Sequence, residues 1–455
     1  MGVSVDGKLI ELEIVDLAFD GKAVAHLDGK VVFLRGGLPG ETVLAEITRS
    51  RSRYSDGIVR QILKPSPCRV EAVCSHFRQC GGCTWQDLAY PDQLGFKKKQ
   101  VVDCLKRIGK LEDVTVHDVV GSVELFYYRN KMEFSFHTVD PDHFHLGLHS
   151  RGRYDDIFDL KQCYLQSPEC NEIVRWLREF VACKKISVYD VRQHTGYMRF
   201  LMIRQAKRQP HLLVNIVTNY GEIPARDELV RGLTAACPEV TTIVHNQNGK
   251  RANIATGEIE SVLLGSGYIE EKMFSSIFRI RANSFFQTNS IQTETLYRTA
   301  FDVLNPDPRD RVLDLYCGTG SIGILIAPYV QQVVGVELVG EAVETARENA
   351  ALNKITNITF EQSTVRDFLK NLPAGPDSFD IVIVDPPRAG LHPKALPRIL
   401  KLKPKKILYI SCNPATFARD ARSLVNQGYR LPDVRPIDMF PHTMHIELVG
   451  VFYAD

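Results

Sequence analysis

Residues 312–323 read VLDLYCGTGSIG and join an apolar, β-branched segment to a glycine-rich turn. Gly318, Gly320 and Gly323 stand in the spacing G-x-G-x-x-G, after the expected strand and at the start of an expected helix. Glycines at such a turn let the backbone approach a ligand closely, and the start of the helix offers free N–H groups. The motif therefore predicts a nucleotide-type pocket at the carboxyl end of a strand.

A carboxylate follows the glycine motif at the distance expected for a ribose contact. Glu337 ends the segment VVGVE, 19 residues after Gly318, and can accept hydrogen bonds from both ribose hydroxyls. This pattern fits NAD as well as S-adenosylmethionine. Asp314 gives the motif the D-x-x-x-G-x-G form of methyltransferase sequences, and the downstream sequence does not look like a dehydrogenase. Both points favour S-adenosylmethionine.

The glycine motif lies in a region where strands and helices alternate, from about residue 291 onward. This alternation is typical of a doubly wound, mostly parallel sheet. The expected strands in this region are residues 310–317, 331–338, 355–362, 379–387 and 405–413.

Two further regions precede it. Residues 1–64 combine short β-rich segments with Asp-Gly and Gly-Gly turns, which predicts a small antiparallel, OB-like β-barrel. After a boundary at residues 65–67, residues 65–285 read as a mixed α+β central domain, and residues 286–455 form the doubly wound domain. Residues 92–122 can pack on that last domain despite their position in the sequence.

Composition and charge restrict the class of protein. Of the 455 residues, 44% are hydrophobic and 24% are charged, as in soluble globular proteins. Lys and Arg number 56 against 54 Asp and Glu, so a nucleic-acid site has to be a local basic surface. A basic set in the barrel is either such a phosphate-facing surface or a solvated edge: Arg49, Arg51, Arg53, Arg60 and Lys64.

The location is inferred from the termini and the cysteines. No apolar run has the length of a membrane helix, and the N-terminus does not resemble a signal peptide. Eleven cysteines without an export signal indicate a reducing compartment. We therefore expect a cytoplasmic protein that does not bind membranes.

Two strands of the doubly wound region end in residues suited to chemistry. FDIVIVDPPRAG ends a very apolar strand at Asp385, where two prolines fix a rigid turn. KKILYISCNP ends the next strand at Cys412. Ligands bind at the carboxyl ends of strands in open α/β sheets, so we expect both side chains at the ligand-binding edge.

A carboxylate close to the C-terminus also stands out. In FPHTMHIELVGVF, Glu447 leads into a strongly apolar strand and follows His442 and His445. Such a carboxylate is either used in the reaction or paired with a neighbouring His or Arg.

Four ordered motifs resemble those of the RNA uracil-5 methyltransferases: Asp314-Leu-Tyr-Cys-Gly-Thr-Gly320, Asp385-Pro-Pro-Arg388, Ser411-Cys-Asn-Pro414 and Pro441-His-Thr-x-His-x-Glu447. The resemblance covers the whole chain, because the N-terminal region resembles the family's TRAM domain and Phe286-Gln-Thr-Asn289 resembles the element before the first methyltransferase strand. It implies a Rossmann-like class I methyltransferase domain that uses S-adenosylmethionine.

The family's chemistry gives these residues roles. Carbon 5 of uracil is a poor nucleophile until a thiolate adds to carbon 6, and a base must later remove the carbon 5 proton. We expect Cys412 to be the nucleophile and Glu447 the base. A thiol of ordinary pKa is only a few per cent thiolate at neutral pH, so we expect the site to favour the anion. The resemblance implies that S-adenosylmethionine is contacted by Gln287, Tyr316, Glu337 and Asp385.

A cysteine cluster follows the barrel. Cys74, Cys80 and Cys83 lie within ten residues, and the glycines between the last two let the chain curl around a metal centre. Zinc and iron–sulfur sites both use four thiolates, and the spacing does not choose between them. It also leaves the fourth ligand open among Cys68, Cys104, Cys163 and Cys170. The part of the family that this pattern resembles holds a [4Fe–4S] cluster with Cys163 as the fourth ligand, which implies a role in folding or RNA binding.

The barrel and cluster together resemble the ribosomal-RNA branch of the family. We therefore expect 23S rRNA as the substrate, with tRNA as the alternative, no DNA partner and a monomer. Phe126–Lys131, Arg151, Arg153 and Arg281 are candidate RNA contacts, whereas Lys97–Lys99 are expected on a solvated helix face. Two other functions fit parts of the sequence: a dinucleotide-dependent iron–sulfur redox enzyme and a non-catalytic RNA-binding protein.

Overall fold

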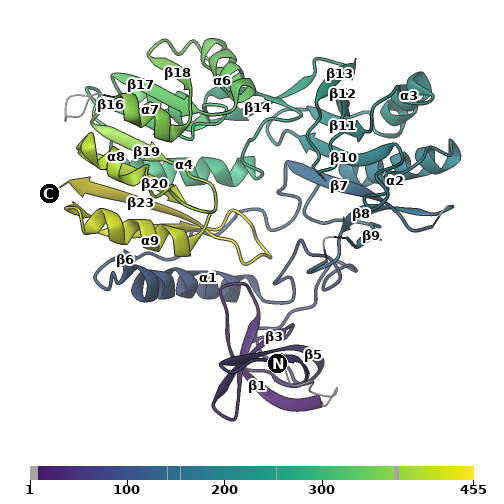
Figure 1. Ribbon diagram of the computed structural model, residues 1–455, viewed down its shortest axis with the longest axis horizontal. Helices are drawn as coiled ribbons and strands as arrows, with labels where there is room; N and C mark the ends of the chain where they lie inside the picture. The colour runs from purple at the N-terminus through teal and green to yellow at the C-terminus, as the bar shows by residue number, and fades with distance from the viewer. Residues whose placement is uncertain (1–8, 141, 154, 253, 373–378, 455) are drawn as a thin grey trace.

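The computed structural model describes residues 9–140, 142–153, 155–252, 254–372 and 379–454 (Figure 1). A small barrel lies at one end of the molecule, and two larger sheets lie side by side above it (Figure 1). Within the described ranges, no helix combines the length and apolar character needed to cross a membrane.

The N-terminal region is a closed five-stranded barrel, as the sequence predicts, although residues 1–8 of the expected range lie outside the described residues. In β1, the buried Leu12, Ile14 and Leu17 alternate with exposed neighbours, so one face of the strand fills the barrel. The barrel is not wholly antiparallel, because β3 and β5 pair in parallel. In barrel order the strands are β1 (Leu9–Leu17), β2 (Ala23–Leu27), β3 (Lys30–Arg35), β5 (Tyr54–Lys64) and β4 (Thr42–Ser50).

The middle of the chain forms a seven-stranded sheet. In sheet order its strands are β13 (Ile259–Leu264), β12 (Val240–Gln247), β11 (Leu212–Thr218), β10 (Met198–Gln205), β7 (Lys131–Thr138), β8 (Phe144–His149) and β9 (Ile157–Asp159). Its core includes apolar residues of the helices α2 (Pro168–Cys183) and α3 (Arg226–Ala236). A hairpin of β14 (Tyr268–Met273) and β15 (Ser276–Arg281) leads out of this sheet, and its apolar residues belong to the core of the next sheet.

The C-terminal region is a doubly wound sheet, as predicted. Neighbouring strands are β18 (Ile358–Gln362), β17 (Gln332–Glu337), β16 (Arg311–Leu315), β19 (Ile381–Val384), β20 (Lys406–Ser411), β23 (Glu447–Ala454), β22 (Asp433–Ile437) and β6 (Thr115–Val116), and the short β21 (Tyr429–Arg430) also pairs with β23. The first five strands are parallel, whereas β23 runs antiparallel to β20 and to β22.

Helices cover both faces of this sheet, because successive residues of a strand point to opposite faces. Val312 and Leu313 of β16, for example, belong to different cores. The core on one face includes residues of α4 (Ser290–Leu304), α5 (Ser321–Ile326), the 3₁₀ turn η2 (Ala327–Tyr329) and α6 (Gly340–Leu352). The core on the other face includes residues of α7 (Val365–Asn371), α8 (Leu396–Lys401) and α9 (Pro414–Val425).

A segment from before the middle sheet joins this last domain. Helix α1 (Tyr90–Cys104) continues as the π-helical turn η1 (Leu105–Gly109), packs against α9 and leads to β6, which extends the C-terminal sheet beside β22 (Figure 1). The expectation that Lys97–Lys99 form a solvated face is wrong for one residue. The Lys97 side chain is 0% exposed, whereas the side chains of Lys98 and Lys99 are 38% and 44% exposed.

The barrel is tied to the cysteine-rich segment by a buried charge network. Arg69 Nε donates to Glu41 Oε1 at 2.6 Å, and Arg69 Nη1 donates to Asp87 Oδ2 at 2.7 Å. The Glu41 side chain is 0% exposed and also accepts from the backbone N–H of Leu38 at 2.8 Å. A buried carboxylate depends on such partners, because water cannot solvate it there.

We therefore expect Arg69→Met to lower the free energy of unfolding of the barrel region by about 3–5 kcal/mol, because it leaves the Glu41 carboxylate buried without its cation. Arg60→Met is the matched control. Its pair with Glu46 is solvent-exposed, so its loss should cost less than about 1 kcal/mol. Urea denaturation followed by barrel-specific amide exchange measures both changes. Equal effects of the two substitutions would contradict the structural role of the Arg69–Glu41 pair.

Candidate active site

The glycine motif and the two chemistry-bearing strand ends meet at one edge of the C-terminal sheet. β16, β19 and β20 are parallel neighbours, so the residues that follow them lie at the same edge. Tyr316 and Gly318 follow β16, Asp385 follows β19, and Cys412 follows β20. The backbone N–H groups of Tyr316 and Cys317 donate to the Val336 carbonyl, which holds the start of the turn against β17.

Two glycines shape the turn. Gly318 and Gly320 have φ values of +53° and +79°, a region that glycine occupies without a steric penalty. At Gly320 a Cβ atom would stand 2.8 Å from the Phe360 ring, so only glycine fits there. The Glu337 carboxylate then accepts from the N–H groups of Gly318 (3.2 Å), Leu338 (2.7 Å) and Val339 (2.9 Å), which fixes it at the rim of the turn.

Strand pairing brings Glu447 next to Cys412. β20 and β23 are antiparallel with Ser411 opposite Leu448. In that register the residue after Ser411 faces the residue before Leu448, so Cys412 and Glu447 are neighbours across the strand pair. The C-terminal carboxylate thereby joins the edge formed by the parallel strands.

One cavity of about 700 Å³ connects these residues. Its lining includes the four expected cofactor contacts, Gln287, Tyr316, Glu337 and Asp385, and the two expected catalytic residues, Cys412 and Glu447. Phe440 and His445 of the loop before β23 also line it, as do Arg129 and Phe285 from outside the sheet. The volume suits a nucleoside-sized ligand with room for a second group. The backbone turn, the Glu337 carboxylate and the apolar walls fit S-adenosylmethionine.

Buried carboxyl groups dominate the electrostatics of the cavity. Burial raises the pKa of Asp385 to about 7 and, with the Asp385 carboxylate as a further cause, the pKa of Asp314 to about 8. Burial also raises the pKa of Glu447 well above its usual value, again reinforced by Asp385. A positively charged ligand would relieve this concentration of acidic groups, as the sulfonium of S-adenosylmethionine does.

The expectation that the site favours the Cys412 thiolate is wrong. Burial, with the carboxylates of Glu447 and Asp385 as further causes, raises the pKa of Cys412 to about 11, although Arg388 opposes the shift. Burial and the acidic neighbours therefore both disfavour the anion.

Arg388 has a partner on the opposite wall. Its Nη2 lies 3.2 Å from His445 Nδ1. Arginine can only donate, so Nδ1 accepts and the neutral ring carries its proton on Nε2. Burial, reinforced by the Arg388 charge, lowers the pKa of His445 to about 4, which keeps the ring neutral at physiological pH. His445 stood out in the sequence without a role. Its contact with Arg388 gives it one, as a neutral hydrogen-bond acceptor in the cavity wall.

The expected metal ligands lie around a second cavity, of about 790 Å³. Cys74, Cys80, Cys83 and Cys163 all line it. The other candidates for the fourth ligand lie elsewhere: Cys68 packs on the barrel core, Cys104 in the core beneath α9, and Cys170 in the core of the middle sheet. In the ranges that the structure describes, no three His, Cys, Asp or Glu side chains are arranged closely enough to hold a single metal ion.

The two cavities share wall residues. Arg129 and Thr288 line both of them, and the Arg129 guanidinium lies 5.8 Å from the centre of the Phe440 ring. Arg129 stood in the predicted RNA-contact element, but its place between the cavities could not be read from the sequence. Some lining residues were missed altogether because they belong to no local motif, among them Phe285, which is 68% exposed.

The chain is similar in sequence to known RNA methyltransferases. A family model described as tRNA (Uracil-5-)-methyltransferase matches residues 235–455, and a TRAM domain model matches residues 4–59. The chain is 40% identical to an RNA methyltransferase of Chlorobaculum tepidum, over 98% of this chain and 96% of that one, and 38% identical to one of Caldanaerobacter subterraneus, over 98% of both.

A solved structure is similar over its entire length. It is the tRNA (uracil-54, C5)-methyltransferase of Pyrococcus abyssi in complex with S-adenosyl-L-homocysteine, with a TM-score of 0.77 and 31% identity over 97% of this chain and 100% of that one. These likenesses favour a methyltransferase over the dinucleotide-dependent redox enzyme.

The buried Asp314 predicts a pH-dependent stability. Its pKa is about 8 in the folded protein and 3.8 in an exposed reference state, so the folded chain holds a proton that the unfolded chain releases. The stabilisation that this group contributes is therefore complete below pH 3.8 and is lost as the pH rises towards about 8. Between pH 5 and pH 7, wild type should lose about 1.4 kcal/mol per pH unit more than Asp314→Asn, as one titrating proton requires.

The measurement is urea denaturation at a series of pH values. Asp302→Asn, at an exposed position of α4, is the control and should give a curve parallel to that of wild type. A parallel curve for Asp314→Asn as well would mean that Asp314 is ionised in the folded protein.

Proposed function

This chain belongs to the tRNA (uracil-5-)-methyltransferase family and carries a TRAM domain, and on that premise we propose that it transfers a methyl group to carbon 5 of a uridine in 23S rRNA. The methyl donor of this RNA methyltransferase is S-adenosylmethionine. The observation that best supports the proposal is the register of β20 and β23, which sets Cys412 beside Glu447 in the wall of one cavity.

When bound, S-adenosylmethionine supplies an electrophilic methyl group on a positively charged sulfur. Gln287, Tyr316, Glu337 and Asp385 would hold it, since all four line the cavity beside the glycine turn. The Cys412 thiolate adds to carbon 6 of the uracil and makes carbon 5 nucleophilic. The methyl group would then pass to carbon 5, with S-adenosylhomocysteine as the leaving group. The Glu447 carboxylate then takes the carbon 5 proton, the double bond between carbons 5 and 6 re-forms, and the Cys412 sulfur leaves.

Two classes of RNA are candidates for the substrate. A barrel and a four-cysteine cavity in one chain resemble the ribosomal-RNA branch, which favours 23S rRNA. The similar structure from Pyrococcus abyssi acts on a tRNA, which makes tRNA the second candidate. Exposed basic residues of the barrel, including Arg49, Arg51 and Arg53, are suited to either polyanion.

Fluorouracil-containing RNA tests the reaction and the substrate together. Fluorine at carbon 5 cannot be removed as a proton, so the methylated adduct should remain bound to the protein. With S-adenosylmethionine and fluorouracil-containing 23S rRNA, we expect a covalent product whose mass spectrum links Cys412 to one nucleotide. Cys412→Ala should give none, whereas Cys183→Ser, at an exposed cysteine, should behave as wild type.

An adduct with tRNA alone would support the proposed mechanism but would identify tRNA, and not 23S rRNA, as the substrate. No adduct with either RNA, from protein that binds S-adenosylmethionine, would contradict nucleophilic addition by Cys412.

We also propose that Cys74, Cys80, Cys83 and Cys163 hold a [4Fe–4S] cluster. Four thiols around one cavity match the ligand number of such a cluster. The Gly82 N–H, which donates to Cys80 Sγ at 3.3 Å, is the type of bond that stabilises a thiolate. When bound, the cluster would cross-link Cys83 to Cys163, which are 80 residues apart in the sequence.

The test is the metal content of protein purified without oxygen. We expect about four iron atoms per chain and the broad visible absorption of an iron–sulfur cluster. Cys163→Ser should lose most of the iron, while Cys170→Ser, in the core of the middle sheet, should keep it. Stoichiometric zinc without visible absorption would contradict the cluster.

A further inference from the structure

The connection between β22 and β23, residues 438–446, carries part of the active-site wall and is here called the 438–446 loop. Phe440 and His445 line the cavity from this loop, and Glu447 is the first residue after it. Ile437 pairs with Glu447 across the two strands, so the loop begins and ends beside the proposed base. Its conformation therefore sets the direction in which Glu447 and His445 enter the cavity.

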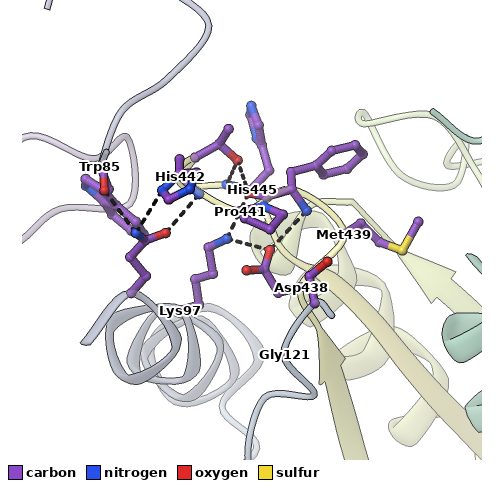
Figure 2. Close-up of polar contacts among 12 residues, drawn as sticks. Trp85, Lys97, Gly121, Asp438, Met439, Pro441, His442 and His445 are labelled. Carbon is purple, nitrogen blue, oxygen red and sulfur yellow. Dashed lines mark hydrogen bonds and ion pairs between the residues drawn. The ribbon is translucent and has the colours of Figure 1, made fainter. Parts of the chain in front are cut away.

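Helix α1 holds the start of this loop through a buried ion pair. Lys97 Nζ lies 2.7 Å from Asp438 Oδ1 and donates to the Phe440 carbonyl at 3.1 Å (Figure 2). Both side chains of the pair are 0% exposed. The second oxygen of Asp438 accepts from the Tyr90 hydroxyl at 2.9 Å, and Oδ1 also accepts from the Phe440 N–H at 3.0 Å. One lysine thus fixes a side chain and a backbone carbonyl of the loop at once.

The same helix holds the middle of the loop at a strained residue. His442 has a φ of +65°, which is uncommon for a residue with a Cβ. Its N–H donates to Gln93 Oε1 at 2.9 Å, and its carbonyl accepts from the N–H groups of Thr84 and Trp85 at 2.8 and 3.0 Å. Figure 2 shows His442 and the Lys97–Asp438 pair on the side of the loop that faces α1. A strained backbone conformation of this kind persists only where several surrounding contacts hold it in place.

A buried ion pair is seldom retained for its stability alone. Removing two charges from water costs about as much as their attraction returns, and apolar residues of similar volume often serve as well. The pair instead fixes a conformation. Lys97 contacts both the Asp438 carboxylate and the Phe440 carbonyl, which holds residues 438–440 in one position. The Lys97 side chain does not line the catalytic cavity, so it acts through the loop.

We infer that Lys97 is a positioning residue, which through Asp438 and the Phe440 carbonyl fixes the 438–446 loop so that Glu447 can reach the carbon 5 proton. This inference rests on the proposed function of Cys412 and Glu447. It assigns Lys97 to the second half of the reaction. Cys412 follows β20, and the expected S-adenosylmethionine contacts lie at strand ends or, for Gln287, in the loop before α4. The contacts of the Lys97–Asp438 pair are with Tyr90 and Phe440 instead.

Loss of Lys97 should leave the first steps of the reaction intact and block only the last. With the loop displaced, the Cys412 sulfur still bonds to carbon 6 and carbon 5 still receives the methyl group. The carbon 5 proton then remains, the double bond does not re-form, and the RNA stays attached to Cys412. Loss of Lys97 should therefore trap methylated adduct on ordinary uridine RNA, as direct loss of the base in Glu447→Gln should.

The experiment compares Lys97→Met with Lys98→Met, an exposed neighbour on the same helix that pairs with Asp118. The substrate is an ordinary uridine transcript of whichever RNA traps the wild-type protein when it contains fluorouracil. We expect Lys97→Met to lower kcat by about 10- to 100-fold, the range in which a displacement of about 1 Å reduces catalysis. Binding of S-adenosylmethionine should be unchanged, and a denaturation-resistant, methylated protein–RNA product should accumulate.

A second variant guards against misfolding, since Lys97→Met leaves Asp438 buried without its cation. Lys97→Met/Asp438→Asn removes both charges, and it should also lower kcat and accumulate adduct. Adduct levels equal to those of Lys98→Met in the folded variants would overturn the inference, and so would lost turnover without adduct. If the wild-type protein forms no fluorouracil adduct, the proposed function fails instead, which separates the two failures.

Discussion

The antiparallel insertion of β23 between β20 and β22 is the constraint on which the site depends. The parallel strands alone bring the glycine turn, Asp385 and Cys412 to one edge, as in any doubly wound sheet. They do not bring Glu447 to that edge. Because β23 runs the opposite way, its first residue arrives at the edge where β20 ends, and Glu447 faces Cys412. Reversing that one strand would place Glu447 at the far end of the sheet.

The chain approaching β23 is held by parts of the protein that are distant in sequence. Thr84 and Trp85 come directly after Cys83 and donate to the His442 carbonyl. Met444 packs against the barrel core, and α1 supplies the Lys97 contacts. The barrel, the cysteine-rich segment and α1 thus all meet at the 438–446 loop. The proposed centre at the cysteines would stiffen the backbone that contacts this loop, and would in that way affect the reaction without any electron transfer.

Local motifs predicted what depends on neighbouring residues in sequence. The glycine turn, the strand ends at Asp385 and Cys412 and the small N-terminal barrel were all expected. Hydrophobic periodicity, turn residues and the residues at strand ends are signals that can be read from neighbouring positions in the sequence. The parallel pairing of β3 with β5 was missed because strand direction depends on closure of the barrel. Lys97 was assigned to solvent because a run of lysines on a helix usually is solvated, and its buried partner lies 341 residues away.

The pKa of Cys412 was misjudged for a related reason. A nucleophilic cysteine is usually expected among cations. The sheet edge instead places buried carboxyl groups beside Cys412, and their effect on its pKa exceeds the opposing effect of Arg388. The same acidic edge suits a cationic methyl donor and leaves Glu447 close enough to act as base. Because an acidic edge attracts a cation and disfavours a nearby anion, placing base, nucleophile and cationic donor in one cavity opposes the Cys412 thiolate.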